Sequence, residues 1–334
     1  MREFTTKGMH LYTRNECIDL MNRWGGEGRP FLFAVPFDAG SGWVVPADAV
    51  PEGVFFQVPL ESRMPDAVPL PDPVEFRAEP PDFEAYCRAF ACVQSHLMRG
   101  DSYLLNLCFP SRLETNLSLR DFAARAVSPY KLLVDGEFAC FSPEAFVTVR
   151  GGVMRSFPMK GTIRADVPDA ERRLLEDEKE RREHATIVDL LRNDLSMVCE
   201  GVHVPRFRYV EEVETSRGVI LQTSSEVCGC LPEGWQGRLG DVLFRLLPAG
   251  SVSGAPKEWT VRAIREAEPY ERGFYTGVFG FFDGESLDSA VAIRFVEESV
   301  EGLVYRSGGG ITVLSDAEEE YRELIDKVYV PFAF

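Results

Sequence analysis

The stretch KERREHATIVDLLRNDL, residues 179–195, changes character half-way along its length. Charged side chains dominate its first half. Its second half, from Ile187 to Leu195, repeats apolar side chains at the spacing of one helix face. The pattern predicts a long helix over residues 169–198 that is polar at its start and apolar toward its end.

Two glutamates in the polar half of this helix form the first candidate ligand set. Glu180 and Glu183 are three residues apart, so their carboxylates lie on one helix face. Glu320 and Glu323 repeat this spacing near the carboxyl terminus. Two such pairs facing each other would offer only oxygen ligands, which Mg²⁺ prefers. Each pair by itself is more typical of a solvated, charged helix surface.

Other helices are predicted on both sides of this stretch. Apolar spacing indicates a helix at residues 82–99, ended by Gly100-Asp101. A helix from Pro256 to about Ala267 is expected because proline favours the first helical position. The last helix should open at Ser315, since Ser315 and Glu318 have the spacing of a capping box.

Strand patterns complete the fold class. Two strand-like runs, 274–282 and 287–297, flank Asp283-Gly284, which is a strong hairpin signal. A further strand is expected over residues 102–109, and the proline-rich residues 45–82 suggest an irregular connection or short edge strands. Long helices beside an antiparallel hairpin indicate an α+β fold rather than alternating βαβ units.

Composition limits the cellular context. The chain has 334 residues, 45% of them hydrophobic, which suffices for one large domain or two ordinary ones. A formal net charge of −17 opposes binding to nucleic acid or to an anionic membrane. No apolar run approaches the roughly 18 residues of a membrane span, and residues 1–4 lack an apolar signal core. Eight scattered cysteines suit free thiols, so we expect a cytoplasmic protein.

Several short segments could bind a ligand. The triplet Gly308-Gly309-Gly310 allows close backbone approach to an anion, and Ser251 lies before a helix start, where a carboxylate or phosphate can bind. Lys160, between proline and glycine neighbours, would be a nucleophile only if burial lowers its pKa. Tyr275 and Arg294, expected on the two hairpin strands, could grip a carboxylate. Each segment also has a simpler interpretation: a turn for the glycine triplet, a capped helix start for Ser251, and solvated surface charges for Lys160 and Arg294.

Taken together, these segments resemble the chorismate-utilising enzymes, a family that includes anthranilate, aminodeoxychorismate, isochorismate and salicylate synthases. The resemblance runs from about Asp101 to Lys327. It rests on seven motifs in family order: Ser142-Pro143-Glu144, Pro158-Met159-Lys160-Gly161-Thr162, residues 179–195, Gly250-Ser251-Val252-Ser253-Gly254-Ala255-Pro256-Lys257, Arg272-Gly273-Phe274-Tyr275-Thr276-Gly277, Ile293-Arg294, and residues 308–311 followed by Glu320-Tyr321-Arg322-Glu323.

The resemblance implies a role for each matching residue. The magnesium ligands of this chain would be Glu180, Glu183, Glu320 and Glu323, directly or through water. The general acid, which protonates the departing 4-hydroxyl of chorismate, would be Glu144. The substrate-binding residues would be Tyr275 and Arg294 on the enolpyruvyl carboxylate, the backbone of Gly308, Gly309 and Gly310, and also Ser251, Thr162 and Gln222. The implied fold is two stacked antiparallel sheets with helices outside, in one large domain: residues 1–80 form a short integrated segment and residues 81–334 the chorismate-binding region.

Two positions distinguish the family members. Family members that add water, the isochorismate and salicylate synthases, carry a lysine base at the position where this chain has Leu104. The resemblance therefore disfavours these two activities. Lys160 matches the aminodeoxychorismate synthases, in which this lysine is thought to attack C2 of the ring; anthranilate synthases have alanine there. Leu104 and Gln222 depart from the glutamine and histidine that are usual in the amidotransfer members.

The expected reaction is therefore amination of chorismate to 4-amino-4-deoxychorismate, a step in p-aminobenzoate and folate synthesis. None of the eight cysteines lies in a glutaminase-type elbow, so ammonia should come from a separate glutamine amidotransferase subunit. Two alternatives stay open. One is anthranilate synthase component I with an atypical lysine, and the other is a non-catalytic chorismate-binding relative.

Overall fold

Strand β2 (Phe31–Val35) is buried on both faces and positions the layers of the molecule. In the computed structural model, which describes residues 9–215 and 218–329, the side chains of Phe31, Phe33 and Val35 share a cluster with helix α1 (Arg14–Gly26). Leu32 and Ala34 belong to a different cluster that contains strands of a second sheet. Successive side chains of a strand point to opposite faces, so β2 lies between a helical layer and another sheet.

The first sheet joins the amino-terminal strands to strands from the middle and end of the chain. Its strands pair antiparallel throughout, and β2 pairs with β16 so that Gly280 lies opposite Phe33. Among the described residues it has ten strands, in the order β1 (Tyr12–Thr13), β3 (Ser41–Pro46), β2, β16 (Val278–Phe282), β17 (Leu287–Val291), β10 (Ala145–Arg150), β11 (Val153–Ser156), β14 (Gly218–Cys230) and β12 (Met159–Arg164), with β13 (Glu200–Thr215) also paired to β14.

The second sheet carries the glycine triplet in its strand β19, which pairs along its length with β7. In the described part of the chain it has nine strands, in the order β15 (Gly254–Ala255), β7 (Leu104–Thr115), β19 (Gly302–Ile311), β18 (Phe295–Ser299), β9 (Phe138–Ser142), β8 (Tyr130–Val134), β4 (Val54–Val58) and β5 (Glu61–Arg63), with β6 (Phe76–Glu79) also paired to β7.

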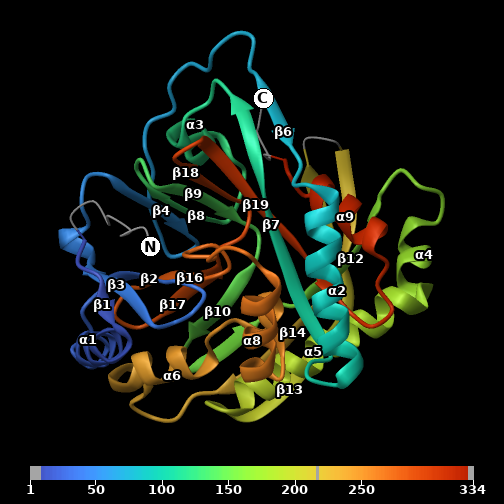
Figure 1. Ribbon diagram of the computed structural model, residues 1–334. Coiled ribbons are helices and arrows are strands. Elements are labelled where there is room, and N and C mark those ends of the chain that lie inside the picture. Colours follow the sequence, from blue (N-terminus) through green and yellow to red (C-terminus); the bar gives the residue numbers. More distant parts are fainter. Residues whose placement is uncertain (1–8, 216–217, 330–334) are drawn as a thin grey trace.

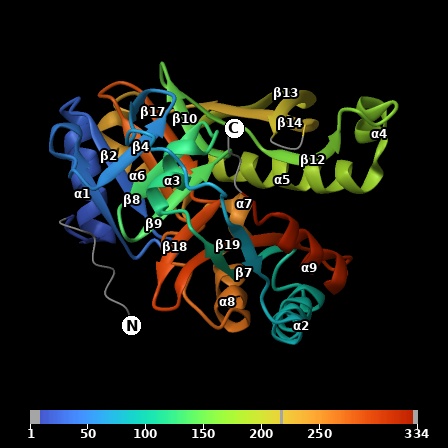
Figure 2. The same ribbon diagram turned by 90° about the horizontal axis from the view of Figure 1, so that it is seen from above.

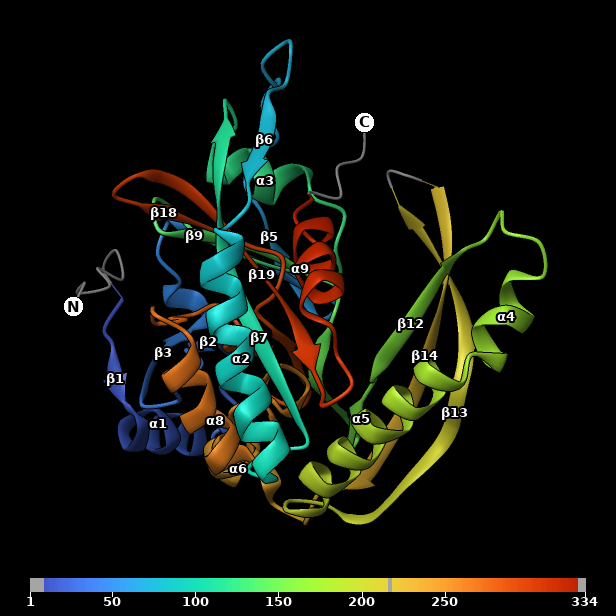
Figure 3. The same ribbon diagram turned by 45° about the vertical axis from the view of Figure 1, so that its right-hand side comes forward.

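Helices cover the outer faces of both sheets (Figures 1 and 2). Helices α1 and α6 pack on the first sheet, whereas α2, α8 and α9 share a cluster with β7 and β19 of the second. Figure 3 shows α4 and α5 lying along β12, β13 and β14 at the far end of the first sheet from α1. The helices not yet delimited are α2 (Phe83–Arg99), α3 (Leu119–Arg125), α4 (Ala170–Glu176), α5 (Glu178–Ser196), α6 (Leu239–Leu246), α7 (Gly250–Ser253), α8 (Lys257–Ala267) and α9 (Ala317–Asp326).

The core between the sheets is rich in aromatic side chains. Phe279 and Phe281 of the first sheet meet Phe56, Phe138 and Phe295 of the second within one cluster. The Phe56 and Phe281 rings stack with centroids 5.3 Å apart. Burying a phenylalanine side chain contributes about 1.5–3 kcal/mol, so this cluster joins the two sheets firmly. The predicted α+β fold with two stacked antiparallel sheets and helices outside is confirmed.

Several predicted elements have different ends. The long helix divides into α4 and α5 at Asp177, whose side chain caps α5 by accepting a hydrogen bond from the Glu180 N–H. The capping box at Ser315 is wrong: α9 begins at Ala317, and Asp316 caps it by accepting from two backbone N–H groups. Ser315 instead donates to Glu320 Oε1 at 2.7 Å. Helix α8 begins at Lys257, one residue after the predicted proline.

The predicted hairpin exists, but Tyr275 and Arg294 do not lie on its strands. Strand β16 begins at Val278, and β17 ends at Val291. Tyr275 belongs to the tight turn before β16, which needs Gly277 because a Cβ there would lie 2.3 Å from the Val35 carbonyl oxygen. Arg294, with φ 54°, lies where the chain leaves the first sheet and enters β18 of the second. Both residues are therefore at the junction between the sheets.

The amino-terminal part of the chain supplies strands to both sheets, β1 to β3 in the first and β4 to β6 in the second. Residues 1–4, where the sequence lacks an apolar signal core, lie outside the described residues. Among the helices that the structure describes, none combines the length and apolar character needed to span a membrane.

Candidate functional site

A cavity of about 630 Å³ lies between the two sheets and is bounded by α5. One wall comes from Met159 and Lys160 of β12 and from the polar half of α5. The opposite wall comes from β7 and β19. The turn before β16, the crossover at Arg294 and helix α7 close its inner end. The predicted site residues that line it are Glu144, Lys160, Glu183, Ser251, Tyr275, Arg294, Gly308 and Gly310.

Glu144 and Ser251 form the closest contact within this cavity. The Ser251 hydroxyl donates to Glu144 Oε1 at 2.5 Å. Burial raises the pKa of the Glu144 carboxyl, while the Ser251 hydrogen bond and the charge of Arg294 oppose that rise. A carboxyl whose protonated form is favoured by burial can donate a proton, which suits Glu144 to general-acid work.

Lys160 extends from β12 toward α5. Its Nζ lies 2.9 Å from Glu183 Oε2, and about a third of its side chain is exposed. Burial lowers the pKa of Lys160, but Glu183, Glu323 and Glu180 together outweigh burial and raise it. In this arrangement a carboxylate in direct contact with the amine therefore opposes the effect of burial.

Of the four predicted metal ligands only Glu183 lines the cavity. Glu180 approaches Gly161, where a Cβ would lie 3.0 Å from Glu180 Oε2, and Glu320 and Glu323 of α9 approach Gly309 of β19 in the other sheet. The positive charge of Lys160 acts on the carboxylates of Glu180, Glu320 and Glu323 as well as on its ion-pair partner Glu183.

Burial raises the pKa values of Glu180 and Glu320, whereas the nearby Lys327 outweighs burial and lowers that of Glu323. Glu180 Oε2 is buried and has no hydrogen-bond partner. Lys160 and Lys327 hold Glu183 and Glu323 in ion pairs at 2.9 and 2.6 Å, and within residues 9–215 and 218–329 no three potential ligands converge on one point. The donor set is nevertheless all carboxylate with one unpartnered oxygen, which fits a Mg²⁺ ion.

Tyr275 and Arg294 lie at the inner end of the cavity. Tyr275 is 3% exposed, and the Arg294 Nε atom is buried without a hydrogen-bond partner. Arg294 forms no ion pair with a carboxylate among the described residues, and it lies over the Tyr329 ring at 5.3 Å, so its Nε is the atom left for an anionic group. The predicted carboxylate clamp would lie at this place.

The glycine triplet divides between the two faces of β19. Gly308 and Gly310 line the cavity, whereas Gly309 faces Glu320 and Glu323 on the other side. A Cβ on Gly308 would lie 2.5 Å from Cys108 Sγ, so no larger residue fits against β7. Thr162 and Gln222 do not line the cavity; they are register partners in the β12–β14 pair, which extends beyond it.

Sequence reasoning missed two polar residues in the cavity wall, Arg306 and Ser307. Arg306 binds Glu297 at 2.6 Å, but its Nη1 atom is buried without a partner, as is Ser307 Oγ. For Arg306 the available signal was strand alternation, because Arg306, Gly308 and Gly310 occupy one face of β19, whereas Ser307 lies on the opposite face. Lys327, which donates to the Gly308 carbonyl at 3.0 Å, was also missed.

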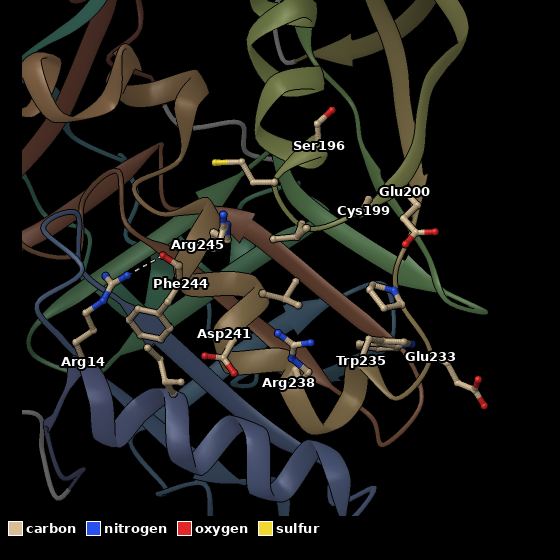
Figure 4. Close-up of a pocket in the computed structure, with 15 residues that line it drawn as sticks. Arg14, Ser196, Cys199, Glu200, Glu233, Trp235, Arg238, Asp241, Phe244 and Arg245 are labelled. Carbon is tan, nitrogen blue, oxygen red and sulfur yellow. Dashed lines mark hydrogen bonds between the residues drawn. The ribbon is translucent and has the colours of Figure 1, made fainter.

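A second cavity of about 620 Å³ lies between α1, α6 and the end of α5 (Figure 4). Arg14 borders it but already donates to the carbonyls of Ala39 and Phe244. Among the side chains that the structure describes, three buried polar atoms without partners belong to residues lining the first cavity, namely Arg294 Nε, Arg306 Nη1 and Ser307 Oγ, and none belongs to the second. The first cavity is therefore the candidate site.

The sequence profile of the chorismate binding enzyme family matches residues 50–332, which include every residue of this cavity. The chain belongs to the chorismate-binding enzyme family. This membership confirms the resemblance drawn from the seven motifs.

Relatives of this chorismate-binding enzyme have several names. An uncharacterized PabA-like protein of Pasteurella multocida is 51% identical over 94% of this chain and 98% of its own. Anthranilate synthase component 1 of Spirochaeta aurantia is 38% identical over 60% of this chain and 43% of its own. Aminodeoxychorismate synthase component 1 of Bacillus subtilis is 29% identical over 74% of this chain and 54% of its own. The solved structure of MenF, the menaquinone-specific isochorismate synthase of Escherichia coli, covers 94% of this chain and 81% of its own. Its sequence is 17% identical and its TM-score is 0.73, which shows a shared fold.

Proposed function

We propose that this chain aminates chorismate to 4-amino-4-deoxychorismate with ammonia supplied by a separate glutamine amidotransferase subunit. The reaction replaces the 4-hydroxyl group by an amino group and releases water. The observation that carries the proposal is the position of Lys160, which enters the same cavity as Glu144, Ser251 and Arg294. An amine in this cavity can form a bond to the substrate ring, and the alanine of anthranilate synthases cannot.

Arg294 and Tyr275 bind the enolpyruvyl carboxylate at the inner end of the cavity, where the Arg294 Nε atom has no protein partner. Glu144 then gives its proton to the departing 4-hydroxyl, and Ser251 holds the resulting carboxylate through the hydrogen bond of 2.5 Å. Arg306 Nη1 and Ser307 Oγ offer two further buried donors to substrate oxygens.

Lys160 acts as the nucleophile. The neutral amine attacks C2 of the ring as the 4-hydroxyl leaves as water, and ammonia then attacks C4 and expels the lysine. The Lys160 ammonium must first pass its proton to the Glu183 carboxylate, 2.9 Å from Nζ, and then leave that contact to attack. Glu180, Glu183, Glu320 and Glu323 would hold a Mg²⁺ ion, which would bind the ring carboxylate and offset developing charge.

Anthranilate synthesis is the second candidate, because an anthranilate synthase component is 38% identical to this chain. That reaction places the amino group on C2 and then eliminates pyruvate to give a fluorescent aromatic product. Lys160 opposes it, since the amine occupies the approach that ammonia would need.

The test is an incubation of the purified chain with chorismate, Mg²⁺ and ammonium, with products identified by mass. The proposal predicts 4-amino-4-deoxychorismate that retains the enolpyruvyl group. Anthranilate with released pyruvate would favour the second candidate, and unchanged chorismate would overturn both.

A further inference from the structure

Arg272 and Glu268 form an ion pair deep inside the protein, with side chains 2% and 1% exposed. Arg272 Nε donates to Glu268 Oε2 at 2.9 Å, and its Nη2 donates to Glu268 Oε1 at 2.6 Å. The Cys108 N–H also donates to Oε1, at 2.9 Å. The pair therefore joins the segment before β16 to strand β7.

The rest of the guanidinium binds three other places in the chain. Nη1 donates to the Val252 carbonyl at 3.0 Å and to Thr276 Oγ1 at 3.2 Å, and Nη2 donates to the Asn106 carbonyl at 2.6 Å. An arginine has five N–H donors, and all five are used. No donor is left for a ligand, so Arg272 does not bind substrate.

All three of these partners line the candidate site. Asn106 lies on β7, Val252 on α7, and Thr276 in the turn before β16. Thr276 also fixes its neighbour, because its hydroxyl donates to the Tyr275 carbonyl at 2.6 Å. Thr276 has φ 57°, a conformation that side chains other than glycine rarely adopt without support. One side chain thus connects three segments that are far apart in the sequence.

Stability does not explain such a group well. Removing two charges from water costs several kcal/mol per ion, and well-packed apolar replacements of buried ion pairs are often neutral or stabilising. The structure assigns Arg272 the role of a positioning residue, which holds β7, α7 and the Tyr275 turn in the arrangement that the cavity requires. This inference rests on the proposed function for its effect on turnover, but not for its effect on the three segments.

The first test replaces Arg272 by lysine, which keeps the positive charge but has three donors on one nitrogen. Misplacement of a site by about 1 Å can lower a rate by roughly a hundredfold. We expect Arg272→Lys to lower kcat for chorismate amination by that order, measured well below its thermal midpoint and normalised to folded protein.

Arg150→Lys is the matched control. Arg150 binds the buried Asp288 at 2.7 Å and donates to the carbonyls of Val149 and Leu287, away from the cavity. It should lose stability without losing kcat. Equal kcat values for the two variants, or a loss of activity that tracks only the unfolded fraction, would overturn the inference.

The second test does not depend on the reaction. Hydrogen exchange of the ligand-free protein should quicken selectively in residues 104–108, 250–253 and 273–277 of Arg272→Lys, compared with wild type. If that variant does not fold, Glu268→Gln is measured instead, because it keeps the shape and the acceptor for Cys108. If exchange quickens selectively in these segments but the wild-type protein does not aminate chorismate, the positioning role is supported and the proposed function is refuted. Exchange that is unchanged, or that quickens uniformly, refutes the positioning role.

Discussion

Replacing Ser251 by alanine removes the hydrogen bond that ties Glu144 to helix α7. The bond is short, at 2.5 Å, and it favours the ionised form of Glu144 against burial, which favours the protonated form. Without the hydroxyl the pKa of Glu144 rises, because burial is then opposed only by the positive charges of Arg294 and Lys327. A general acid must be protonated to act, so the variant should stay active at higher pH than the wild type.

The magnitude follows from the kind of bond lost. A hydrogen bond to a charged group contributes about 1.5–3 kcal/mol, and about 1.4 kcal/mol is a factor of ten in an ionisation equilibrium. The ratio of protonated to ionised Glu144 at a fixed pH should therefore rise by roughly ten- to hundredfold. The assay is kcat/KM for chorismate as a function of pH. The alkaline limb, where kcat/KM falls, should move to higher pH.

Ser251→Thr is the matched control, because threonine keeps the hydroxyl at the same carbon. Its alkaline limb should stay where the wild-type limb lies. An unmoved or downward-shifted limb in Ser251→Ala would show that Glu144 is not the proton donor. A shift of equal size in both variants would show that packing, and not the hydrogen bond, controls the profile.

Three further predictions concern the clamp, the carboxylates and the strand pair. Arg294→Gln should raise KM for chorismate by about a hundredfold, because a charged, bidentate donor is lost; titration calorimetry that finds unchanged affinity would refute the clamp. Turnover should disappear in EDTA and return with Mg²⁺, and Glu180→Gln should remove most of it; full activity in EDTA would contradict the metal assignment. Gly308→Ala should lower the free energy of unfolding by about 1–3 kcal/mol through overpacking against Cys108, and an unchanged thermal midpoint would contradict that geometry.

Local patterns in the sequence predicted those elements whose ends are set by local chemistry. Helix α2 begins after its cap Asp82 and ends at Gly100, which has the left-handed conformation expected there. The hairpin between β16 and β17 closes around Asp283-Gly284 as predicted. In both cases residues adjacent in sequence satisfy the backbone, so the signal is complete within a short window.

The failed predictions share a long-range cause. The sequence pattern extended the hairpin strands to Tyr275 and Arg294. In the structure the backbone turns at Gly277, which packs closely against the carbonyl of Val35, a residue near the amino terminus. The cap of α9 is a local exception: Asp316 caps the helix, and the Ser315 hydroxyl donates to Glu320 five residues later. The orientation of Lys160 toward Glu183 likewise depends on how β12 meets α5.

The family resemblance supplied site residues that periodicity could not, and the structure brings most of them to one cavity. Thr162 and Gln222 lie on β12 and β14 outside its lining. The other predicted residues that do not line it are Gly309, Glu180, Glu320 and Glu323. Arg306 went unnoticed although it alternates with Gly308 and Gly310 along β19, and Ser307 lies off that alternation. The catalytic roles of all these residues stay predictions.

The most direct test of the account is the mass of the intact protein after incubation with chorismate and Mg²⁺ in the absence of ammonia. If Lys160 is the nucleophile, wild-type protein should gain the mass of chorismate less one water, and Lys160→Ala should gain nothing while still binding chorismate. Added ammonia should discharge the adduct as 4-amino-4-deoxychorismate. An unmodified wild-type protein, together with wild-type rates of 4-amino-4-deoxychorismate formation by Lys160→Ala, would contradict the central claim.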